Sequence, residues 1–102
     1  MKPRITRSSG NVFKDLGFSE EEAENLKIRS DLMGHVRRLM DKRGLTQARA
    51  AKLMGVSQPR VSDLVRGKID SFSIDSLVAM LARLGARVSL AVATRPRRSR
   101  VA

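Results

Sequence analysis

The strongest constraint on the fold is a repeated pairing of a hydroxyl residue with a glycine nine to twelve residues later. Ser and Thr side chains accept hydrogen bonds from the free N–H groups that begin a helix, and glycine readily adopts the left-handed conformation that ends one. Three segments begin with such a hydroxyl residue, end with such a glycine and have apolar residues at helical spacing between them. They begin at Thr46, Ser57 and Ser73 and end at Gly55, Gly67 and Gly85. The chain is therefore predicted to be mainly helical.

A longer helical segment precedes these three. Ser19 and Glu22 have the spacing of a capping box, and apolar residues then recur at every third or fourth position until Gly44 ends the pattern. This pattern fits one helix over residues 19–43, or two helices with a break near residues 29–30. The expected fold class is all-α, with five helices.

The segment after the last helix has a different period. Apolar and polar residues alternate over 87–93, which predicts a single β-strand. A lone strand leaves its backbone groups without partners, and no other segment of this sequence has a strand pattern. The same strand of a second copy is the simplest partner and would make a twofold dimer. Its interface residues would be Val88, Leu90 and Val92.

The length and composition indicate one domain. The chain has 102 residues and 41% apolar residues, which is enough for a small core. We expect a flexible arm over 1–12, the folded domain over 13–93 and a basic, disordered tail over 94–102. Cysteine is absent, which excludes disulfides and thiolate chemistry. No apolar run reaches the ~20 residues of a membrane span, so the expected location is the cytoplasm or the nucleoid.

The distribution of charge indicates a polyanionic partner. The formal net charge is +11. Residues 35–68 hold nine basic against two acidic side chains, whereas residues 8–34 hold three basic against six acidic ones. The four arginines of the tail and three basic residues before residue 8 add to the positive total. A basic block inside a folded domain is typical of proteins that bind nucleic acid.

Within the basic block, residues 47–66 (QARAAKLMGVSQPRVSDLVR) have the residue types of two helices that cross closely. Ala51 is small where the second helix would lie over the first. Gly55 allows the left-handed backbone of a tight turn without steric cost. Val61 and Leu64 are placed to lock the second helix onto the first. This spacing predicts a helix-turn-helix motif over residues 46–67.

The segment TQARAAKLMGVSQPRVSDLVRGK, residues 46–68, resembles the helix-turn-helix of Xre/Cro-type regulators. With GNVFKDLGF at 10–18 and FSIDSLVAMLARLGARVSLAV at 72–92, the chain is similar to the small antitoxin-type regulators related to host-inhibition antitoxins. The resemblance covers about residues 10–93. It implies a five-helix Xre/Cro-type domain whose second motif helix enters the major groove of DNA.

The resemblance also assigns roles to single residues. Base edges would be contacted by Gln58, Pro59, Arg60, Ser62 and Asp63. Glutamine can pair with adenine and arginine with guanine, while an aspartate accepts from cytosine or orients the arginine. Pro59 departs from the polar residue often found there and offers only shape or methyl contact. The resemblance implies a phosphate contact at Gln47. Further phosphate contacts are expected, from charge and position, at Arg49, Ser57, Arg66 and Lys68.

Other chemistry lacks the necessary residues. His35 is the one histidine, and without cysteine it has no companions for a zinc site. We expect no catalytic residue, metal or cofactor, and hence no enzyme. The expected function is a sequence-specific regulator, a repressor that binds a palindromic operator in double-stranded DNA as a homodimer.

The sequence leaves three further possibilities for the function of the protein and its partners. The protein could be an antitoxin that represses its own operon and binds a cognate toxin. It could instead be a protein-interaction module without specific DNA readout. It could also be a non-specific nucleoid-associated protein whose main site is the Arg-rich tail.

Overall fold

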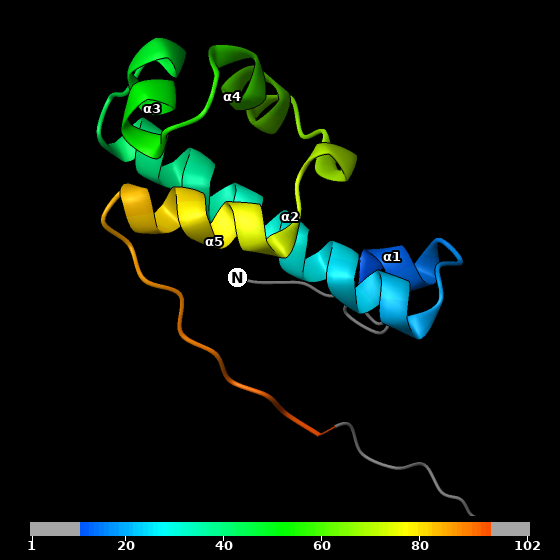
Figure 1. Ribbon diagram of the computed structural model, residues 1–102. Coiled ribbons are helices and arrows are strands. Elements are labelled where there is room, and N and C mark those ends of the chain that lie inside the picture. The colour runs from blue at the N-terminus through cyan, green and yellow to red at the C-terminus, as the bar shows by residue number, and fades with distance from the viewer. Residues whose placement is uncertain (1–10, 95–102) are drawn as a thin grey trace, which may run out of the picture.

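A computed structural model describes residues 11–94 of the protein. This part of the chain holds five α-helices and one 3-10 helix, arranged around a long central helix (Figure 1). The elements are α1 (Val12–Asp15), α2 (Glu20–Lys42), α3 (Gln47–Met54), α4 (Gln58–Val65), η1 (Ile69–Ser71) and α5 (Ile74–Arg83). The mainly helical fold class agrees with the sequence prediction, and the five α-helices agree with the number that the resemblance implies.

The central helix α2 runs without interruption through residues 29–30, so the segment 19–43 forms one helix. Ser19 caps it, accepting from the Glu22 amide at 3.1 Å, and the Glu22 carboxylate accepts from the Ser19 amide in return. Helix α5 packs along α2, while α1 and α3 lie near its two ends (Figure 1). One continuous helix thereby provides the surface on which the remaining helices assemble.

The short helices begin at the predicted caps. Thr46, Ser57 and Ser73 each accept a hydrogen bond from the amide three residues later, at 3.1, 3.4 and 3.1 Å. Gly55 ends α3 in the left-handed conformation, with φ of 71°. These ends depend on contacts between neighbours in the chain, so local sequence was sufficient to place them.

The first helix, α1, corrects the expected extent of the N-terminal arm. The sequence predicts a flexible arm through residue 12, yet Val12 begins α1 and Asn11 caps it. The Asn11 Oδ1 accepts from the amides of Phe13 and Lys14, and its Nδ2 donates to the Ala23 carbonyl of α2 at 3.1 Å. Asn11 is only 5% exposed. Residues 1–10 of the expected arm lie outside the described residues.

The core is aliphatic and joins α2 to the other helices. Val36, Val61, Leu64, Leu77 and Leu84 are almost completely buried. Four methionines at helical core spacing are also buried, and these are Met33, Met40, Met54 and Met80. The single fully buried aromatic side chain among the described residues is Phe72, directly after η1. The core thus packs α4 and α5 against α2, and α3 against α4 and α5.

The predicted β-strand over 87–93 is not formed in the described chain. These residues run away from the end of α5 without helix or strand (Figure 1), and none of their backbone groups makes a backbone hydrogen bond there. Val88 is half-buried against the core, but Leu90 and Val92 are 87% and 92% exposed. Alternation favours extended backbone, whereas a strand needs a second strand beside it. The helices of a single chain supply none, and the tail beyond residue 94 lies outside the described part.

Candidate nucleic-acid interface

The two motif helices, α3 and α4, pack closely through small and branched side chains. Ala50 and Ala51 of α3 are buried, and Val61 and Leu64 of α4 have no exposed surface. The turn between the helices depends on Gly55, because its backbone has a positive φ that strains any residue with a Cβ. The arrangement of the pair agrees with the predicted helix-turn-helix.

The first turn of α4 presents polar surface to solvent. Gln58 and Pro59 are exposed at the start of the helix, directly after the Ser57 cap. The Gln58 amide makes no hydrogen bond within the described residues, so its donor and acceptor remain available. Proline is tolerated here because the first-turn amides have no partner inside the helix. Ser62 and Asp63 follow one turn later and are partly exposed.

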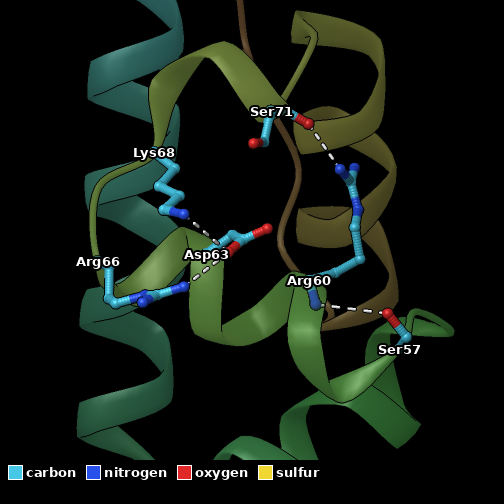
Figure 2. A network of polar contacts seen from close by, with 6 residues as sticks. All are labelled: Ser57, Arg60, Asp63, Arg66, Lys68 and Ser71. Atoms are coloured by element: carbon cyan, nitrogen blue, oxygen red, sulfur yellow. Dashed lines mark hydrogen bonds and ion pairs between the residues drawn. The ribbon is translucent and has the colours of Figure 1, made fainter.

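Arg60, unlike Gln58, contacts other parts of the protein. Its Nη1 donates to the Ser71 carbonyl at 2.6 Å, as Figure 2 shows. Its guanidinium carbon lies 4.4 Å from the centroid of the Phe72 ring. The side chain therefore lies across the joint between η1 and α5, and the residue is half-buried.

Asp63 is held between two basic side chains that follow α4. Its Oδ1 lies 3.1 Å from Arg66 Nη2 and 3.9 Å from Lys68 Nζ (Figure 2). Both cations are largely exposed, so each ion pair contributes at most about 1 kcal/mol to stability. The three charges together leave a net positive edge at the end of α4. Such an edge suits phosphate oxygens.

The other predicted phosphate contacts lie at the start of α3. Gln47 is half-buried as the first residue of the helix, and Arg49 is exposed and has no ion pair in residues 11–94. Thr46 caps this turn. The first turns of both α3 and α4 contain no acidic residue. Free amides and the helix dipole therefore give both starts a positive potential.

The predicted dimer residues lie away from the motif. Val88 and Leu90 border a groove of about 640 Å³ that α2 and the segment after α5 form together. His35 also lines this groove. No group of three or more His, Cys, Asp or Glu side chains in residues 11–94 is arranged to hold a metal ion. No helix of this part is long and apolar enough to cross a membrane.

Sequence reasoning missed three residues that support the motif. Arg29 of α2 donates from Nη1 to the carbonyls of Ile69 and Phe72, at 3.0 and 3.2 Å. Arg83 covers the turn at Gly55, and Ser71 holds Arg60. The contacts of Arg29 span 40 and 43 positions of the sequence. No local pattern marks them, because the partners of Arg29 come within its reach only when the helices pack.

Comparisons with known proteins agree with this geometry. A family described as a helix-turn-helix domain matches residues 12–93. A solved structure described as an XRE family transcriptional regulator is 31% identical in sequence, with a TM-score of 0.69. The similarity covers 79% of this chain and 91% of that one. Among curated proteins, none matches this sequence significantly.

Proposed function

Because the chain belongs to the helix-turn-helix family of XRE transcriptional regulators, which bind DNA, we propose that it binds a specific operator and represses transcription from it. The observation that carries this proposal is the exposed first turn of α4. Gln58 offers an amide without a partner among the described residues, and Arg66 and Lys68 lie at the other end of the helix, beside Asp63. A free amide can read adenine in the major groove, and the flanking cations hold the phosphates.

The test begins with selection of a preferred site from random duplex DNA by the full chain. Fluorescence anisotropy at fixed salt then compares Gln58→Ala with Lys68→Ala. We expect Gln58→Ala to lose about 1–3 kcal/mol of binding free energy on the selected site and little on random DNA. Lys68→Ala should weaken binding to the selected site and binding to random DNA by a similar factor. Failure to select any site, or equal losses for Gln58→Ala on both DNAs, would contradict specific readout and favour a nucleoid-associated role.

The second part of the proposal is a homodimer on a palindromic operator. The groove beside α2 is mostly apolar and includes Ile28, Leu32, Leu39, Leu81, Val88 and Leu90. Leu90 and Val92 expose nearly all of their surface in a single chain, and the neighbouring backbone groups have no backbone partners there. A second copy would cover these side chains and pair these groups. Two α4 helices would then lie about 34 Å apart, one turn of DNA.

The dimer is tested by truncation after Gly85, with Leu90→Asp as a point variant. Both should shift sedimentation towards the monomer and weaken operator binding, because each half-site alone binds less tightly. Ala82→Asp provides a control with the same added charge at an exposed position on α5. An unchanged dimer after truncation would show that other surfaces hold the two copies together.

We further propose that the regulator is an antitoxin and that its toxin binds at the opposite end of the molecule from α3. Leu16 and Phe18 are exposed there, and Phe18 lines a shallow pocket together with the exposed Glu21 and Glu22. Apolar side chains among acidic ones suit a basic protein. This end lies near α1, remote from α3 (Figure 1), so one chain could hold a toxin and DNA together.

This role predicts a toxin gene directly beside the gene of this protein. Expression of the adjacent gene product should arrest growth, and co-expression of this chain should relieve the arrest. Leu16→Asp combined with Phe18→Asp should abolish relief while operator binding persists. If the neighbouring product has no effect on growth, or if the double variant still relieves the arrest, the antitoxin assignment or its docking surface is wrong.

A further inference from the structure

The segment η1 and the residue after it are held from two sides by arginines. From α4, Arg60 donates to the Ser71 carbonyl at 2.6 Å and lies over the Phe72 ring at 4.4 Å. From α2, Arg29 donates to the carbonyls of Ile69 and Phe72 at 3.0 and 3.2 Å. Phe72 is 3% exposed, so its ring is a fixed part of the core. Two helices are thereby connected through one short segment.

The geometry of Arg60 conflicts with the role that the family resemblance implies. To read guanine, an arginine directs two N–H groups in one plane towards O6 and N7. Here Nη1 donates to a backbone carbonyl, and the guanidinium lies against an aromatic ring. Release of the side chain would leave the Ser71 carbonyl without this donor and would uncover the Phe72 ring. Gln58, two residues earlier, carries no such internal contacts among the described residues.

We propose that Arg60 is a positioning residue and that it stays on Ser71 and Phe72 when the protein binds its operator. It connects the first turn of α4 to η1, and Arg29 connects η1 to α2. The angle of the recognition helix on the body of the protein is set by this pair of contacts. Base contacts are then left to Gln58, Pro59 and Ser62. The inference rests on the proposed operator binding.

The first experiment compares Arg60→Met and Gln58→Ala on the selected operator and on every single-base-pair variant of it. Methionine keeps an unbranched apolar side chain, but it ends short of the guanidinium position, so it can neither donate to Ser71 nor place a cation over the Phe72 ring. A positioning role predicts that Arg60→Met weakens binding to all of these sites by one common factor, roughly 3–10-fold. Gln58→Ala should instead flatten the preference at one base pair. Loss of preference at a single G·C pair in Arg60→Met would overturn the proposal.

The second experiment observes the side chain directly, with or without DNA. The Phe72 ring should shift the NMR signals of the Arg60 side chain upfield in the free protein, and Phe72→Leu should remove that shift. We expect the signals to keep their positions when operator is added to the wild-type chain. Unshifted signals in the free protein, or signals that move on operator binding, would overturn the proposal. Because the free protein is observed as well, failure of operator selection is distinguishable from failure of the Arg60 contact.

A double-variant cycle connects the two measurements. If Arg60 acts through the ring, Phe72→Leu should weaken operator binding as Arg60→Met does, again equally at all base pairs. The double variant should bind no more weakly than the worse single variant, because both remove one connection. Additive losses would contradict a shared connection. Circular dichroism checks that the Phe72→Leu variant folds. If this variant does not fold, the NMR signals of the wild-type chain still test the proposal.

Discussion

The starts of α2 and of the two motif helices differ in how their free amides are neutralised. Helix α2 begins with three glutamates and a full capping box, so its own side chains satisfy its dipole and its amides. Helices α3 and α4 have a single hydroxyl cap each and no acidic residue in the first turn. The start of α2 therefore needs no further anion, whereas the starts of α3 and α4 keep a positive potential that can attract an external anion. The acidic first turn of α2 therefore stabilises its own helix, whereas the first turns of α3 and α4 lack that stabilisation, as the proposed DNA contacts require.

The largest effect is expected when the first turn of α3 is given an acidic residue, as the first turn of α2 has. Arg49→Glu places a carboxylate in the first turn, which should raise the free energy of unfolding by about 0.5–1 kcal/mol. The same change replaces a predicted phosphate contact with a repelled charge. Binding to any DNA should fall roughly 10–100-fold at 0.1 M salt. Thermal unfolding and anisotropy measure the two effects, and parallel losses of stability and affinity would refute the division of roles.

The two serine caps offer a matched pair of variants. Ser19→Ala and Ser57→Ala each remove one cap, and each should lower the free energy of unfolding by about 1 kcal/mol. Because Ser57 lies at the predicted interface, its variant should also bind operator and random DNA about 3–10-fold more weakly. Ser19→Ala should bind with wild-type affinity once corrected for the folded fraction. Equal DNA affinities of the two variants would remove Ser57 from the interface.

The smallest effect is expected at the acidic end. Lys14 pairs with Glu20 at 2.8 Å, but both side chains are more than 40% exposed. Lys14→Ala should change the free energy of unfolding by less than about 0.5 kcal/mol. Loss of one positive charge here should leave the salt dependence of DNA binding unchanged, whereas Lys68→Ala should flatten its slope by about 1. Equal slopes for both variants would show that overall charge, and no particular surface, controls binding.

Most of the motif could be predicted because its signals are local. The caps at Thr46 and Ser57 act on amides three residues away, and Gly55 requires only its own backbone conformation. Helix α1 was missed because four residues are too few to show a helical period. Its position depends on Asn11, whose partner at Ala23 is twelve residues distant. Neither the continuity of α2 nor the anchoring of α1 is visible in a short window of sequence.

The remaining differences arise from partners that lie far along the chain or outside it. Alternating residues over 87–93 favour extended backbone, but a strand forms only where another strand accepts its hydrogen bonds, and the packed helices of one chain offer none.

The side chain of Arg60 gives the clearest contrast between local and tertiary information. Its place in the first turn of α4 follows from the Ser57 cap, three residues before it. Its direction follows from Ser71 and Phe72, which α5 and Arg29 hold in place. Helix ends depend on hydrogen bonds between near neighbours, so the order of residues was enough to place them. The direction of a long side chain depends on which groups packing brings within its reach, and only the assembled helices decide that.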